Sequence, residues 1–203
     1  MKPRHFSLRF SLWGGLLCLL LCVLTLMAPA ALALSGKITE FGVPTPDSRP
    51  WSITAGPDGN IWFTEILGNK IGRITPAGVI TEFGVPTPEG PDGITAGPDG
   101  NLWFTEASAG LIGRITPAGV ITEFAVPTAY SDPRGITAGP DGNIWFAESQ
   151  GNNIGHISPN GKNKVTEFAV PTAYSDPRGI TAGPDGNIWF TEALGGNQIG
   201  QLH

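Results

Sequence analysis

The sequence predicts an all-β protein, a β-propeller of about four four-stranded blades of ~42 residues each. The first observation is a period of 41, 42 and 44 residues between tryptophans in equivalent places, namely Trp62, Trp103, Trp145 and Trp189. This is the range of four-stranded propeller blades, and it is too long for ankyrin, tetratricopeptide or leucine-rich repeats. The second observation is composition: no segment shows a sustained helical period, while short β-branched and aromatic runs alternate with Gly, Pro, Asn and Asp.

A long internal repeat supports this prediction. The segment 122–146, TEFAVPTAYSDPRGITAGPDGNIWF, recurs letter for letter at 166–190, and looser copies precede it at 81–104 and 39–63. These copies and their linkers account for the chain after the first thirty or so residues. We therefore expect one repeat domain at 34–203.

The third copy shows how one blade divides into strands. Residues 135–139 (GITAG) form a short first strand of small residues, which suits the crowded inner edge of a propeller. Residues 140–143 (PDGN) predict a tight turn, because Pro fixes φ at its second position and Gly accepts positive φ. The other strands are predicted at 143–148, 153–158 and 165–170.

The second strand is apolar on both faces. Ile144 and Phe146 point to one side and Trp145 to the other, because successive side chains alternate along a strand. A sheet with two apolar faces must lie between two neighbouring sheets. A propeller blade meets that requirement.

Residues 1–33 are predicted to be a secretory signal peptide. Basic residues precede an apolar run at 12–27, and Ala31-Leu32-Ala33 supplies a small-x-small cleavage pattern. The competing hypothesis is an uncleaved membrane anchor, but the apolar run is interrupted by two glycines and is shorter than the ~20 residues that span a bilayer. Cleavage predicts a secreted, extracellular protein without membrane attachment.

Loss of this leader removes three of the 12 basic residues and both cysteines. The nine basic and 17 acidic residues that remain give a formal net charge of −8. This charge argues against nucleic acid or anionic lipid as a partner, because both require a basic face. A secreted chain without cysteine must be held together by packing, without disulfides or a zinc–thiolate site.

The two ends of the predicted domain complement each other. Residues 37–43 (KITEFGV) have a fourth-strand sequence, and residues 198–202 (QIGQL) have a third-strand sequence. We expect the segment 37–43 to pair with the last blade and close the ring, which removes both sheet edges. The competing hypothesis is a truncated reading frame. The domain is accordingly expected to be a monomer or a ring-completing homodimer.

The runs ITAGPDGNIWFTE at 53–65 and GNKIGRITPAGVITEFGVPTP at 68–88 resemble the streptogramin B lyase (virginiamycin B lyase) family, and the resemblance covers the chain after the leader. It implies a seven-bladed propeller that opens cyclic depsipeptide antibiotics at the ester by C–O elimination, without water and with the assistance of Mg²⁺. This chain supplies material for four blades. Apart from the implied Mg²⁺, no cofactor is predicted.

Elimination needs a base to remove a proton and a cation or donor to hold the charge that develops. In the family the base is a histidine that follows the proline just before the first strand. The matching positions here hold no histidine; they are Trp51, Asp92, Arg134 and Arg178. Because arginine stays protonated, no catalytic residue is assigned.

If the loops before the first strands and after the second strands open on one face, these four residues line a ligand-binding mouth. Glu148 and Glu192, at the ends of second strands, are expected to join them, although they would equally suit a solvated blade rim. Asp132 and Asp176 are weak candidates for Mg²⁺ ligands. The simpler interpretation is that each aspartate pairs with the nearby arginine.

Two functions from different classes remain. One is a lyase that acts on a cyclic depsipeptide or another ester, with Arg134 and Arg178 on the carbonyl oxygen and a glutamate as base. The other is a non-catalytic propeller that binds a ligand, such as a small cyclic peptide or ester, or a protein. His156 is interpreted as a solvated third-strand residue, because equivalent positions hold arginine or glutamine.

Overall fold

The computed structural model describes residues 36–159, 164–195 and 197–203. The chain divides into two compact units, residues 1–40 and 41–203. The predicted signal peptide lies outside the described residues, and residues 36–40 form neither helix nor strand. Within the described ranges, no helix is long and apolar enough to cross a membrane.

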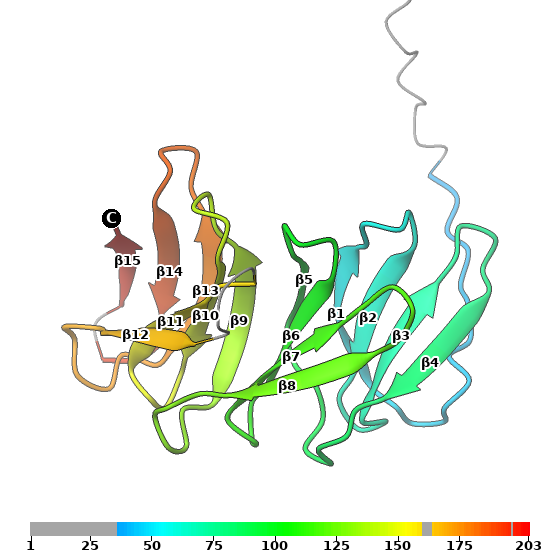
Figure 1. The fold of residues 1–203 in the computed structure, drawn as a ribbon, viewed down its shortest axis with the longest axis horizontal. Coiled ribbons are helices and arrows are strands. Elements are labelled where there is room, and N and C mark those ends of the chain that lie inside the picture. Colours follow the sequence, from blue (N-terminus) through cyan, green and yellow to red (C-terminus); the bar gives the residue numbers. More distant parts are fainter. Residues whose placement is uncertain (1–35, 160–163, 196) are drawn as a thin grey trace, which may run out of the picture. The chain divides into compact units, whose positions relative to one another are not determined.

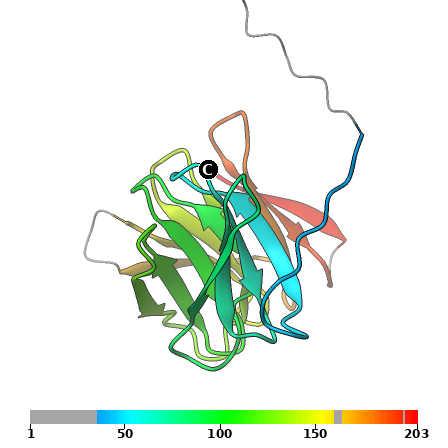
Figure 2. The same cartoon turned by 90° about the vertical axis from the view of Figure 1, so that its right-hand side faces the viewer.

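Residues 41–203 form four antiparallel sheets, each with its strands in sequence order, as Figures 1 and 2 show from two directions. Blade 1 consists of β1 (Pro50–Ala55), β2 (Ile61–Glu65), β3 (Lys70–Ile74) and β4 (Ile80–Gly84). Blade 2 consists of β5 (Ile94–Ala96), β6 (Leu102–Glu106), β7 (Leu111–Ile115) and β8 (Ile121–Ala125). Blade 3 consists of β9 (Pro133–Ala138), β10 (Ile144–Glu148), β11 (Asn153–Ile157) and β12 (Val165–Ala169). Blade 4 has β13 (Pro177–Ala182), β14 (Ile188–Glu192) and β15 (Gln198–Leu202).

The all-β prediction of four blades is therefore confirmed. In blade 3 the strand boundaries agree with the sequence to within two residues. The largest difference is at the start of β9, which begins at Pro133 because Pro133 pairs with Glu148 of β10 beyond an irregularity in the register.

A hydrogen-bonded turn orients the tryptophan of each blade. In blade 1, Trp62 Nε1 donates to Asp58 Oδ1 at 3.0 Å, and the backbone N–H of Asn60 donates to the same oxygen at 3.2 Å. Gly59 has a φ of 76°, which a side chain would disfavour. The same indole–aspartate bond recurs at Trp103, Trp145 and Trp189.

Successive blades pack through unlike faces. The tryptophan face of one blade meets the face of the next blade that carries its second-strand phenylalanine, so that Trp62 and Ile71 share a core with Phe104. Equivalent cores join blades 2 and 3 and blades 3 and 4. A buried hydroxyl adds a polar link, because Thr64 Oγ1 donates to the carbonyl oxygen of Asp92 at 2.7 Å.

The expected closing strand is not observed. Residues 37–43 form no strand, and within the described residues β15 pairs only with β14. The chain after residue 40 is held by blade 1 instead of blade 4. Thr45 donates from its backbone N–H and its hydroxyl to the carboxylate of Glu82, both at 2.9 Å, and the ring of Phe41 covers Gly78.

The third strand requires glycine where it passes the second-strand phenylalanine, since a Cβ on Gly113 would clash with the ring of Phe104. We predict that Gly113→Ala lowers the free energy of unfolding by about 1–3 kcal/mol through overpacking, measured as a lower urea midpoint by tryptophan fluorescence. Gly84→Ala is the control, because a Cβ there meets nothing within 4 Å and its effect should stay within ~0.5 kcal/mol. Equal midpoints for both variants would contradict this account of the third strand.

Candidate functional site

A pocket of about 340 Å³ lies where the first strands of the blades, or the residues just before them, approach one another. Trp51 lies on β1, Asp92 just before β5, Arg134 on β9 and Arg178 on β13, and all four line this pocket. The structure thus brings together the four positions to which the sequence pointed. Their role in binding a ligand stays a prediction.

Arg134 connects two blades at the centre of the site. Its Nη1 lies 3.2 Å from Asp92 Oδ2 of blade 2, and its Nη2 lies 2.9 Å from Asp132 Oδ2 beside it. Asp132 also accepts a hydrogen bond of 2.6 Å from Ser149 Oγ. This network holds the guanidinium in place while its side chain remains 36% exposed. Arg134 therefore keeps donor surface facing the pocket.

Four residues of this chain occupy the positions at which the family carries its histidine, and among them only Asp92 is a carboxylic acid. Its Oδ1 accepts a hydrogen bond of 3.1 Å from Trp51 Nε1, and its Oδ2 faces Arg134. Burial raises the pKa of the Asp92 carboxyl, although the Arg134 guanidinium favours the charged form. A partly buried carboxyl with a raised pKa in a pocket has the properties of a candidate general base.

Two further cations lie at the rim. Arg178 pairs through Nε with Asp176 Oδ2 at 2.8 Å and is more exposed than Arg134. The guanidinium of Arg49 lies 5.3 Å from the ring centre of Trp51, within the range of a cation–π contact. Sequence reasoning did not single out Arg49. The sequence did contain one feature that could have identified it: Arg49 is basic, whereas the equivalent position in blades 3 and 4 holds an aspartate.

The second-strand glutamates do not reach this pocket. Glu148 is fully buried and Glu192 nearly so, and neither lines any pocket described for residues 41–203. Glu148 is enclosed by the turn that follows β10, where a Cβ on Gly151 would come within 2.6 Å of its Oε2. The expected solvated blade rim is not found either. Burial, reinforced by nearby carboxylates, raises the pKa of Glu106 to about 8 and that of Glu148 to about 7.

The described acidic residues do not fit a magnesium site at the mouth. Asp132 and Asp176 are each engaged by the arginine two residues later, as the simpler interpretation expected. Within the described ranges, no group of three or more His, Cys, Asp or Glu side chains is placed to hold a metal ion.

His156 lies away from the mouth, and it is not simply solvated. Its ring centre is 4.6 Å from that of Trp145 and 5.8 Å from that of Phe168. Burial lowers the pKa of His156, which favours the neutral ring. Arg73 occupies the equivalent position above Trp62. In blades 1 to 3 this position therefore packs against the aromatic layer, because Arg114 lies over Trp103 in the same way.

Comparison with known proteins gives a consistent result. The chain matches the family described as the virginiamycin B lyase family over residues 29–203. A virginiamycin B lyase from Bacillus licheniformis is 51% identical over 39 residues, a match that covers 19% of this chain and 13% of that protein.

Solved structures extend the similarity to most of the chain. Virginiamycin B lyase from Staphylococcus aureus superimposes with a TM-score of 0.79 at 51% identity, covering 83% of this chain and 57% of that one. A catalytically inactive histidine-to-alanine variant from the same organism, solved with quinupristin, gives a TM-score of 0.74 at 47% identity and covers 81% and 58% of the two chains. The chain thus spans less than two thirds of the length of these relatives.

The buried glutamates make stability depend on pH. A carboxyl whose pKa is higher in the folded than in the unfolded state stabilises the fold fully below the unfolded value, and this contribution is lost as pH rises through the folded value. We therefore predict that the free energy of unfolding, and with it the thermal midpoint, decreases as the pH is raised from about 5 to about 8. Glu106→Gln should make this decrease in the free energy of unfolding smaller by on the order of 1–3 kcal/mol, because the amide cannot ionise.

The matched control is Glu40→Gln, which changes an exposed carboxyl and should leave the pH profile unchanged. Thermal melts at a series of pH values test both variants. An identical slope for Glu106→Gln and the wild type would show that Glu106 is ionised in the folded protein at neutral pH.

Proposed function

Because the chain belongs to the virginiamycin B lyase family, we propose that its pocket binds a cyclic depsipeptide or a related cyclic ester. One observation carries the proposal: Trp51, Asp92, Arg134 and Arg178 come from four different blades and line one pocket. A pocket assembled from several rigid sheets suits a ligand that presents several groups at once.

The charges at the mouth favour a neutral ligand rich in acceptors. Three arginines line the pocket, but Glu89 and Asp92 line it too, and Asp132 and Asp176 pair with two of the arginines. The balance leaves no strongly positive field for a phosphate or a nucleic acid. Guanidinium groups that are already partly paired still donate to carbonyl oxygens, and the exposed ring of Trp51 offers an apolar surface.

A second candidate function is elimination at the ester, and it rests on Asp92. A carboxylate there would take the proton from the carbon next to the breaking bond, and the electron pair left behind would form the double bond as the C–O bond breaks. Arg134, 3.2 Å from Asp92, would hold the charge that develops on oxygen. Glu148 is not proposed as base, because it is enclosed.

The Mg²⁺ implied by the family resemblance enters no step of this proposal, since Arg134 and Arg178 engage the nearby carboxylates. When bound, such an ion would supply positive charge at the ester oxygen. We also propose that the protein acts outside the cell after cleavage near Ala33, as the leader sequence predicts.

Binding is tested with quinupristin, the compound in the solved S. aureus structure. We predict that Arg134→Ala weakens the affinity by about 10- to 100-fold, because it removes a charged donor and frees two carboxylates to repel the ligand's oxygens. Isothermal titration calorimetry measures the change. Lys164→Ala, which removes an exposed cation outside the pocket, is the control. The proposal fails if Arg134→Ala binds as tightly as the wild type.

Elimination is tested by mass spectrometry, which should show a ring-opened product of unchanged mass. We predict that Asp92→Asn lowers the rate by about 10²- to 10⁴-fold, whereas Glu89→Gln at the same pocket has little effect. Because the base acts when deprotonated, the wild-type rate should rise with pH through the raised pKa of Asp92 and then level off. If quinupristin binds but no product forms, the proposed ligand-binding function stands and the proposed lyase function is contradicted.

A further inference from the structure

The chain contains two tyrosines, and both are exposed in the loops that lead into the first strands of blades 3 and 4. Tyr130 is 90% exposed and Tyr174 is 88% exposed. Blade 3 shares a hydrophobic core with the blade on each side of it, so the exposure of Tyr130 is a property of its loop and not of an end of the chain. Each phenol ring therefore adds almost no packing to the fold.

Both tyrosines adopt a backbone conformation that suits other residue types better. The φ angle is 57° at Tyr130 and 56° at Tyr174, in the left-handed region that is costly for a bulky residue. The matching position of blade 1 holds Asp47 with a φ of 52°, and the loop of blade 2, which is one residue shorter, uses Gly90 with a φ of 73°. Asp and Gly accept this conformation more readily. The tyrosines thus strain their loops without a compensating gain in packing.

Each tyrosine lines a pocket at the boundary between two blades. The pocket at Tyr130 has a volume of about 310 Å³ and includes residues of blades 2 and 3. The pocket at Tyr174 has a volume of about 400 Å³ and includes residues of blades 3 and 4. Each pocket also contains the arginine four residues after its tyrosine, Arg134 or Arg178. Both flanking pockets adjoin the central pocket of the mouth, because Arg134 lines all three.

A phenol ring beside a guanidinium group favours a flat aromatic partner. An exposed aromatic face attracts another aromatic ring by offset stacking, and the plane of a guanidinium group stacks on such rings as well. Asp132 and Asp176 pair with Arg134 and Arg178, so part of each positive charge is already neutralised. An anionic group would meet these carboxylates, whereas a neutral aromatic ring would not be repelled.

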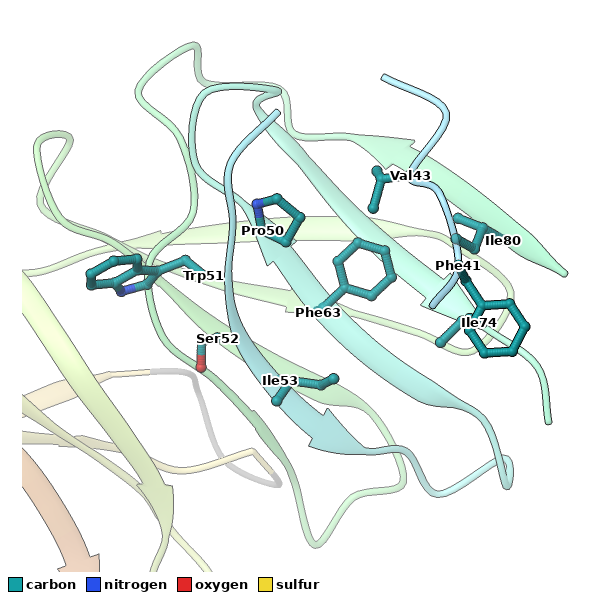
Figure 3. A pocket seen from close by; sticks show the side chains of 9 residues that line it. All are labelled: Phe41, Val43, Pro50, Trp51, Ser52, Ile53, Phe63, Ile74 and Ile80. Carbon is teal, nitrogen blue, oxygen red and sulfur yellow. The ribbon is translucent and has the colours of Figure 1, made fainter. Parts of the chain in front are cut away.

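A third aromatic side chain lies at the mouth in blade 1. Trp51 lines the central pocket, and its Nε1 donates to Asp92 Oδ1 at 3.1 Å. Figure 3 shows its ring directed away from Phe63 and Phe41, which line an apolar groove of blade 1. Blades 1, 3 and 4 therefore each bring an aromatic side chain to the mouth.

We propose that Tyr130 and Tyr174 are two equivalent ligand-contacting residues, each of which stacks on an aromatic ring that projects from the cyclic ligand. Arg134 or Arg178 lies beside that ring in each flanking pocket. The central pocket then contacts the ester-containing ring, and the flanking pockets select ligands whose substituents are aromatic. This inference deepens the proposed function and rests on it.

Fluorine NMR of the full chain labelled with 3-fluorotyrosine reports on these two positions alone, because the chain has two tyrosines. We expect two resonances, which Tyr130→Phe assigns, and we expect quinupristin to shift both of them. N-acetylphenylalaninamide serves as a second probe that contains an aromatic ring and no ester. At millimolar concentration it should shift both resonances, whereas its cyclohexylalanine counterpart, which is not aromatic, should shift neither.

Tyr130→Asn removes the ring and introduces a residue that tolerates the left-handed conformation. We expect its thermal midpoint to rise by about 2–4 °C, because the strain is relieved. Its affinity for quinupristin, measured by calorimetry, should fall by about 3- to 10-fold, because the stacking contact is lost. Tyr130→Phe keeps the ring and should retain the affinity. Asp47→Asn places the same residue in the matching loop of blade 1, removes no ring, and should also retain it.

The outcomes separate this inference from the proposed function. If quinupristin binds but neither resonance moves, the inference is overturned while the proposed function stands. A lower thermal midpoint for Tyr130→Asn would show that the ring supports the fold, and this too would overturn the inference. If quinupristin does not bind but the aromatic amide alone shifts both resonances, the aromatic subsites stand and the proposed ligand class is wrong. If no compound shifts a resonance or binds, both are wrong.

Discussion

In every blade the second-strand indole donates a hydrogen bond to the aspartate of its own turn, and in blades 1 to 3 the next blade then covers that ring. The hydrogen bond joins residues only four apart in the chain, and it holds the indole ring in the orientation in which the next blade can pack on it. The local turn and the packing between blades therefore favour the same conformation of the tryptophan. A blade alone would leave both apolar faces in water, so each blade depends on its neighbours.

The candidate site uses the ends of these sheets. One position per blade carries a different side chain, and the hydrogen bonds from Trp51 to Asp92 and from Arg134 to Asp92 link three blades in series. Such a network fixes the pocket before a ligand arrives, which limits the entropy lost on binding. Deeper in the blades, the residue that faces each buried glutamate differs. Glu106 faces Leu111 and has the pKa raised to about 8, whereas Glu148 faces Asn153, which donates to it, and its pKa is about 7.

Features with local causes were predictable from the sequence. The strands of blade 3 and its turn at 140–143 follow from alternation and turn chemistry, and the convergence of Trp51, Asp92, Arg134 and Arg178 follows from their equivalent places in each repeat. The burial of Glu148 was not predictable, because alternation gives the side of the sheet but not the turn that covers it. Closure by residues 37–43 is not observed and stays a prediction: within the described residues β15 pairs only with β14, and complementary sequences say which strands can pair but not whether the fold brings them together.

A stretch of 25 residues that runs from β8 of blade 2 into β10 of blade 3 recurs from β12 of blade 3 into β14 of blade 4, and the cores on either side of blade 3 use the same residue types. A blade of this kind can be inserted or deleted in the gene as a unit, because each new neighbour presents the surface that the old one did. Duplication of a repeat therefore changes the circumference of the molecule without requiring compensating substitutions.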